Sequence, residues 1–113
     1  MRAINSTRQT ELASRLAVAD NIFTRMKGLL GRNSLPEGEG LLIRPCKGIH
    51  TFGMKFPIDV VFLDSRNLVI AINRELASNR LTPIYPKGAS VIELPAGTVE
   101  TTATKIGDEI KFA

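Results

Sequence analysis

Three residues whose side chains can bind metals or take part in catalysis follow one another at four-residue intervals: Cys46, His50 and Met54. Cys46 is the only cysteine and His50 the only histidine among the 113 residues. A glycine-broken segment carries all three, and it lies between two strongly apolar runs. Polar loops held between buried strands are common locations for functional sites. We therefore expect the site within residues 40–64, whose sequence is GLLIRPCKGIHTFGMKFPIDVVFLD.

Basic side chains gather around these three residues. Six Lys or Arg and two Glu fall within residues 25–55, so this segment carries +4, which equals the net charge of the whole chain. A locally positive field favours an anion, and glycines let backbone N–H groups approach it closely. The leading hypothesis is a non-catalytic module that binds a small anionic ligand or an acidic segment of a partner protein at the loop formed by residues 46–59. The predicted ligand-binding residues are Arg44, Cys46, Lys47, His50, Thr51, Met54, Lys55 and Asp59.

A thiol-dependent enzyme is the first alternative. Cys46 could act as the nucleophile, with His50 as its base and Asp59 as the group that orients the histidine. The neighbouring Arg44 and Lys47 would lower the pKa of the Cys46 thiol and favour the reactive thiolate.

A soft-metal site is the second alternative. Cys46, His50 and Met54 offer soft and borderline ligands that together suit copper. A fourth ligand would have to come from Asp59 or from a backbone carbonyl. Asp59 also fits a structural role, because a carboxylate on a covered strand needs hydrogen-bond partners to offset its desolvation. The sequence identifies no particular ligand, cofactor or oligomeric state.

The length and composition predict one domain covering residues 1–113, long enough to bury a core. A single cysteine cannot form an internal disulfide, and no apolar run approaches the roughly 20 residues that a membrane helix needs. We expect a soluble, cytoplasmic protein without a membrane partner. The pI of about 9.6 is compatible with nucleic-acid binding. The chain has no basic arm and no recognisable nucleic-acid-binding motif, so nucleic acid is not expected as a partner.

Residues 20–31 carry the clearest helical pattern in the chain. Asp20 is suited to the N-cap, because its carboxylate can accept hydrogen bonds from free backbone N–H groups. Gly31 is suited to end the helix in a left-handed turn. One apolar stripe is expected to pack on the core, and it consists of Ile22, Phe23, Met26, Leu29 and Leu30.

Short strands account for most of the remaining chain. Alternating apolar and polar residues predict a strand at residues 10–18, and residues 58–63 with 68–72 predict an antiparallel hairpin. Further strands are expected at 41–44, 89–94 and 109–112, and a second short helix at 98–106. These elements indicate an α+β fold. We expect six to seven short strands and two short helices, in a mostly antiparallel, strongly curved β-sheet or partial β-barrel.

Three stretches of the chain together resemble a known family. They are DNIFTRMKGLLGR at residues 20–32, the long segment 40–64, and VIELPAG at 91–97, followed by Ile106-Gly107-Asp108. The chain is identified on these motifs as a member of the prokaryotic domain-of-unknown-function 192 family, with the likeness running from about residue 12 to 112. The resemblance implies a compact mixed α/β domain with a barrel-like sheet, and it implies no particular activity. The family motif positions carried over are Cys46, His50, Thr51, Met54, Pro57 and Asp59, and the sequence departs from the pattern at Gly53, where a bulky aromatic residue is expected.

Overall fold

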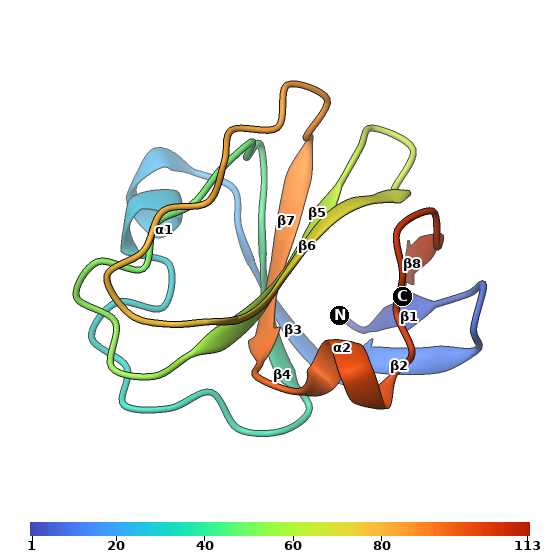
Figure 1. Ribbon diagram of the computed structural model, residues 1–113, viewed down its shortest axis with the longest axis horizontal. Helices are drawn as coiled ribbons and strands as arrows, with labels where there is room; N and C mark the ends of the chain where they lie inside the picture. The colour runs from blue at the N-terminus through green and yellow to red at the C-terminus, as the bar shows by residue number, and fades with distance from the viewer.

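Eight β-strands in two sheets and two short helices make up the computed structural model, which describes residues 1–113 (Figure 1). The prediction of a mostly antiparallel α+β domain is confirmed. The prediction of a single curved sheet or partial barrel is not confirmed, since the strands form two sheets and no closed barrel. The strands are β1 (Ala3–Asn5), β2 (Thr10–Ala13), β3 (Arg15–Ala19), β4 (Glu39–Ile43), β5 (Ile58–Leu63), β6 (Val69–Leu76), β7 (Ser90–Pro95) and β8 (Ile110–Phe112); the helices are α1 (Ile22–Lys27) and α2 (Thr98–Thr101).

The larger sheet has the strand order β3-β4-β7-β5-β6. Its neighbouring strands run antiparallel, except that β3 and β4 are parallel. β5 and β6 form the predicted antiparallel hairpin. All six residues of β5 are buried, as its apolar character on both faces requires. The smaller sheet has the order β2-β1-β8 and brings the two ends of the chain together.

The predicted strand at residues 10–18 is two strands in two different sheets. β2 pairs with β1 in the smaller sheet, whereas β3 pairs with β4 in the larger one. The chain turns the corner at Ser14, where the backbone N–H groups of Ser14 and Arg15 both donate to the Gly38 carbonyl at 2.9 Å. Leu12 and Leu16 still point into the same core, so the period-two pattern continues through the corner and hides it.

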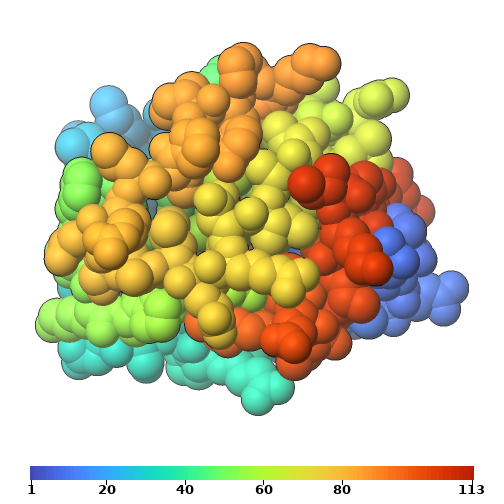
Figure 2. Space-filling model, viewed as in Figure 1, coloured from blue at the N-terminus to red at the C-terminus, as the bar shows by residue number.

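The two faces of the larger sheet bury two separate cores. The first core lies between the two sheets and includes Val61 and Leu63 of β5 and Val99 of α2. The second lies on the opposite face, where Val60 and Phe62 of β5 point. α1 and the long loops that follow β4 and β6 cover this second face, and they gather at one side of the molecule in Figure 1. The loop between β6 and β7 also occupies much of the surface seen in Figure 2.

α1 is shorter than predicted and leaves most of its apolar stripe exposed. Asn21, not Asp20, is its N-cap: the side chain accepts from the Thr24 N–H at 2.9 Å, and Gly28 ends the helix. Ile22, Phe23 and Met26 are exposed, and Phe23 is 80% accessible. The stripe reaches the core only beyond the helix, where Leu29 is buried and Leu30 partly buried. A helix that does not lie flat on the sheet leaves space beneath it, and this space is the site described below.

Both helices are far too short to span a bilayer, and the structure contains no helix that is long and apolar enough to do so.

Candidate functional site

A cavity of about 530 Å³ lies between α1, the loop after β4 and the larger sheet. Its size falls within the range of small-molecule sites. Four of the eight predicted ligand-binding residues line it, namely Cys46, Lys47, His50 and Met54. The structure therefore brings together the three residues spaced four apart, although they do not lie on a helix. The other four predicted residues, Arg44, Thr51, Lys55 and Asp59, do not line the cavity.

The loop after β4 is held in place by the loop between β6 and β7. The Cys46 N–H donates to the Ala89 carbonyl at 3.1 Å, and the Tyr85 N–H donates to the Lys47 carbonyl at 2.8 Å. Gly48 permits the close approach, because a Cβ there would lie 2.6 Å from Cδ1 of Ile84. The two loops therefore form one wall of the cavity, with Ile84 at its exposed edge.

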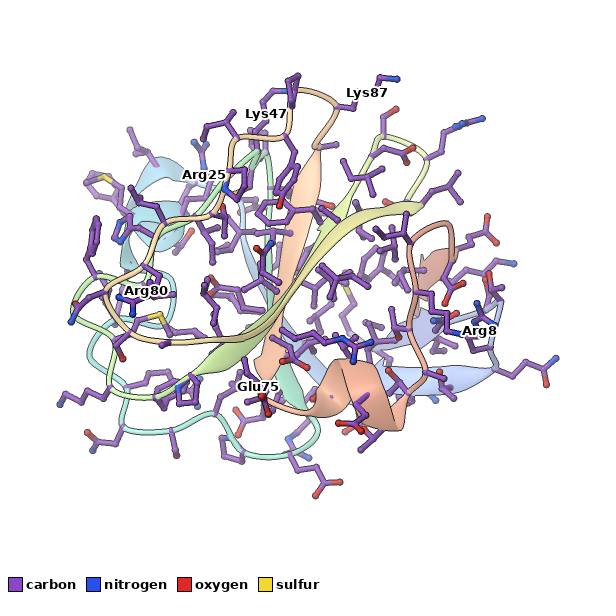
Figure 3. The ribbon with its side chains drawn as sticks, in the orientation of Figure 1. Arg8, Arg25, Lys47, Glu75, Arg80 and Lys87 are labelled. Carbon is purple, nitrogen blue, oxygen red and sulfur yellow. The ribbon has the colours of Figure 1, made fainter.

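Two of the cations at the cavity differ in what their side chains contact. Lys47 is committed to the fold, since its ammonium donates to the Pro86 carbonyl at 2.6 Å and to the Gly88 carbonyl at 3.1 Å. Arg25 is an exposed residue of α1, and its guanidinium makes no ion pair with any acid of the chain. Figure 3 shows Arg25 and Lys47 at the same side of the molecule, far from Arg8. Arg25 was not among the predicted ligand-binding residues, and it is a free cation of the site, as is the exposed Lys27 on the same helix.

His50 lies at the exposed edge of the cavity and is oriented by its neighbours. Its Nδ1 accepts a hydrogen bond from the Phe52 N–H at 3.2 Å, and its ring stacks on the Phe52 ring at a centroid distance of 5.1 Å. The acceptor role of Nδ1 leaves Nε2 as the donor of the neutral ring. Met54 is buried in the second core and contributes an apolar part of the wall.

Two of the four predicted residues outside the cavity make hydrogen bonds that hold the surrounding structure. The Thr51 hydroxyl donates to the Ala77 carbonyl at 2.6 Å and accepts from the Arg80 N–H at 2.9 Å. The two carboxylate oxygens of Asp59 accept from the N–H groups of Glu75 and Val99, each at 2.8 Å. The remaining two residues are at the surface: Lys55 donates to the Asn33 side chain at 3.1 Å, and Arg44 is exposed.

The geometry bears on the two alternative chemistries. Burial is the main cause that raises the pKa of the Cys46 thiol, which is opposite to the lowering that we expected from Arg44 and Lys47. Both oxygens of Asp59 are engaged by backbone amides, so this carboxylate does not orient His50. For a metal, the structure places no group of three or more His, Cys, Asp or Glu side chains close enough to hold an ion.

Glu93 is a cavity residue that our sequence interpretation missed. It lies on β7 and is only 3% exposed, and its Oε1 has no hydrogen-bond partner. Burial raises the pKa of this carboxyl group to about 7. The available signal was a single acid within the apolar run Val91-Ile92-Glu93-Leu94, where a strand buried on both faces should carry none.

Fold and cavity together define a small α+β domain of two packed β-sheets, with a hollow of about 530 Å³ between the larger sheet and α1. The chain belongs to the domain-of-unknown-function 192 family, described as "Uncharacterized ACR", whose model matches residues 3–112. It is 33% identical to a UPF0127 protein of Thermococcus sibiricus, over 96% of this chain and 73% of the relative. A UPF0127 protein of Pyrococcus abyssi is 32% identical over 96% of this chain and 95% of the relative.

Two solved structures share the fold. One is a protein of unknown function from Novosphingobium aromaticivorans, with a TM-score of 0.85 and 19% identity, covering 98% of this chain and 82% of that one. The other, from Sinorhizobium meliloti, is described as a putative transcription regulator. It has a TM-score of 0.80 and 22% identity, and the match covers 97% of this chain and 89% of that one. At these identities the likeness concerns the fold alone.

Proposed function

We propose that this protein is a non-catalytic module that binds a small anionic ligand in the cavity beneath α1. One observation carries the proposal: a 530 Å³ hollow joins Cys46, His50 and Met54 to the exposed, unpaired guanidinium of Arg25. A cavity of this volume suits a small molecule better than a segment of a partner protein. The proposal also places the protein in the cytoplasm, where its single thiol stays reduced.

The lining of the cavity specifies two parts of such a ligand. Ile22, Met26 and Ile49 give apolar walls, which favour an apolar body. Arg25 stands at the opening and can pair with a carboxylate or phosphate at the outer end of that body. Lys47 is less suited to this role, because backbone carbonyls already use its ammonium group. The proposed ligand is therefore an organic acid whose apolar part enters the cavity.

A thiol enzyme is not the function we propose, because a raised pKa keeps the Cys46 sulfur protonated and weakly nucleophilic at neutral pH.

The test is a titration of the ¹⁵N-labelled protein with octanoate, and with octanamide as the uncharged control. Octanoate should shift the amide resonances of residues 25–30 and 46–50, and octanamide should bind more weakly. Arg25→Gln should weaken octanoate binding roughly two- to fivefold, which is the value of one exposed charge pair. Arg66→Gln is the matched control, since Arg66 is exposed at the β5–β6 turn and does not line the cavity.

Three results would contradict the proposal. One is that octanoate at millimolar concentration leaves the resonances of the cavity unchanged, and another is that octanamide binds equally well. A hexaglutamate peptide that binds where octanoate does not would reassign the site to an acidic segment of a partner protein.

A further inference from the structure

We propose that Glu93 binds an ammonium group on the inner end of the ligand, so that the cavity selects an amphiphile with an amine inside and a carboxylate outside. The inference rests on the proposed function and names the ligand class of the same site.

The position of Glu93 on β7 directs its side chain to the face of the sheet that α1 covers. Val91, two residues earlier on β7, belongs to the second core, and side chains two apart on a strand share a face. In the sheet, Glu93 is paired with Leu41 of β4 and Val60 of β5, and both of these are apolar members of the second core. The neighbouring strands therefore give the carboxyl group no donor.

The side that faces the cavity gives Glu93 no partner either. A Cβ on Gly28, at the end of α1, would lie 3.8 Å from Oε1, so glycine places no side chain, and therefore no donor, beside the buried carboxyl group at this point. Glu93 takes part in none of the three ion pairs of the chain, and its Oε1 is the only buried side-chain N or O atom without a hydrogen bond. A buried acceptor left unpaired destabilises a fold, because its desolvation is not offset by a hydrogen bond. An acid at this position therefore serves the cavity and not the stability of the sheet.

The charges around the cavity have an inside and an outside. Glu93 is the buried anion at the wall formed by the sheet, and the titratable groups that face the cavity from the other elements are Arg25, Lys27, Lys47, His50 and Cys46. Of these five, all but the Cys46 thiol are exposed residues. A ligand complementary to this arrangement carries its positive group toward Glu93 and its negative group toward Arg25, with an apolar chain between them.

The experiment compares 8-aminooctanoate with octanoate, which share their chain and carboxylate, at pH 8.5 and pH 5.5. At pH 8.5 the amino compound should bind roughly tenfold more tightly, as expected for one buried charge-assisted hydrogen bond after desolvation of the ammonium. Glu93→Gln, which keeps size and shape, should remove this preference. Glu75→Gln is the matched control, because Glu75 is exposed on β6, on the rim away from the cavity.

A second measurement does not depend on a variant that folds. The pKa of Glu93, followed by the ¹³C shift of its carboxyl carbon, should fall from about 7 in the free protein. A tenfold preference of the ligand for the ionised form corresponds to a decrease of about one pH unit when 8-aminooctanoate is bound. Octanoate alone should not lower this pKa.

The outcomes separate the inference from the proposal beneath it. If octanoate binds in an Arg25-dependent way but 8-aminooctanoate binds no better, the proposed function stands and the role of Glu93 is wrong. If neither compound shifts the resonances of the cavity, the proposed function itself fails. If the preference for the amine persists in Glu93→Gln, another group binds the ammonium and the inference is overturned.

Discussion

Each face of the larger sheet buries a carboxyl group, and the two groups differ in their hydrogen-bond partners. Asp59 of β5 and Glu93 of β7 lie on neighbouring strands, one register step apart, and each is almost completely buried. Asp59 points to the α2 side, where it joins the N–H groups of Glu75 and Val99. Glu93 points to the α1 side and has no partner for Oε1. Burial alone therefore does not distinguish an acid that holds strands and helices together, such as Asp59, from one that is left unpaired, such as Glu93. The hydrogen bonds of the carboxyl group make that distinction.

The same contrast extends to the far end of the molecule, where Asp108 is also satisfied. Its Oδ2 accepts from the Asn5 side chain at 2.9 Å, from Arg8 Nε at 3.0 Å and from the Lys105 N–H at 2.9 Å. The polar groups that hold the smaller sheet and α2 are therefore paired, whereas the α1 side keeps the Glu93 carboxyl group and the cations of Arg25 and Lys27 without protein partners. The hydrogen-bonded carboxyl groups thus lie toward α2 and the smaller sheet, and the unpaired one lies on the α1 side.

The strongest test of this contrast is the isosteric change Asp59→Asn. It should destabilise the protein by about 3–5 kcal/mol, because it removes a charged acceptor and turns the NH2 group of an amide toward one of the two backbone N–H groups that Asp59 binds. Urea unfolding at pH 7 measures the change. A cost below that of Arg66→Gln would show that Asp59 does not hold β6 and α2 in place.

At alkaline pH, Glu93→Gln should stabilise the protein, which is opposite to the effect of Asp59→Asn. The folded pKa is about 7 and the ordinary value is 4.5, so the folded state holds a proton that the unfolded state has lost between these values. This contribution to stability is fully present below pH 4.5 and is lost as the pH rises through 7, a change of about 3 kcal/mol. Between pH 4.5 and pH 8, the difference in unfolding free energy between variant and wild type should therefore change by roughly 2–3 kcal/mol in favour of the variant. If the unfolding free energies of the two proteins differ by the same amount at every pH from 4.5 to 8.5, this prediction is wrong.

Arg8→Gln tests the satisfied end with a smaller effect. Burial acts to raise the pKa of Asp108, but hydrogen bonds from Arg8, Asn5 and the Lys105 N–H outweigh it and hold the pKa below its ordinary value of 3.8. The stability that this carboxylate contributes is present above pH 3.8 and is lost as the pH falls through the lowered value. Removing Arg8 should cost about 1 kcal/mol at pH 7 and should start acid unfolding at a higher pH. Circular dichroism during acid titration measures both effects.

The smallest expected effect concerns the Cys46 thiol, whose pKa responds to the charges of Glu93 and Arg25. Iodoacetamide should alkylate Cys46 with an apparent pKa above that of an ordinary cysteine, mainly because of burial. The Glu93 charge also raises this pKa and the Arg25 charge lowers it. Glu93→Gln should therefore speed alkylation at pH 8 roughly two- to threefold, and Arg25→Gln should slow it. Equal rates in all three proteins would mean that the thiol lies outside the field of both groups.

Local sequence patterns predicted the parts of the fold that depend on neighbours in the chain. The β5–β6 hairpin follows from two apolar runs around a polar turn, and the breaks at Gly48, Gly53 and Pro57 argue against a helix in the loop after β4, where the structure has none. The pattern failed at Ser14, because a strand that changes sheets keeps its alternation. It also failed for α1, whose apolar stripe predicted a packed face but lines an open cavity instead.

The candidate site could be predicted only in part, because half of it depends on long-range pairing. Cys46, Lys47, His50 and Met54 come from one segment, and they were found together. Arg25 and Glu93 come from α1 and β7, and they meet only because β7 inserts between β4 and β5 in the sheet. No spacing along the chain reports that order of strands. Thr51 and Asp59 were predicted to bind a ligand but do not line the cavity. The sequence alone does not distinguish a polar motif residue that holds a loop from one that contacts a ligand.

Gly28 has a consequence for engineering the protein. Its backbone angles, φ 50° and ψ −125°, are those that only glycine adopts easily, and it sits directly over the Glu93 carboxyl group. A side chain introduced at this one position would block access from the cavity to the Glu93 carboxyl group. Alanine, serine and valine would block it to an increasing extent, at the cost of backbone strain and without changing any ionisable residue.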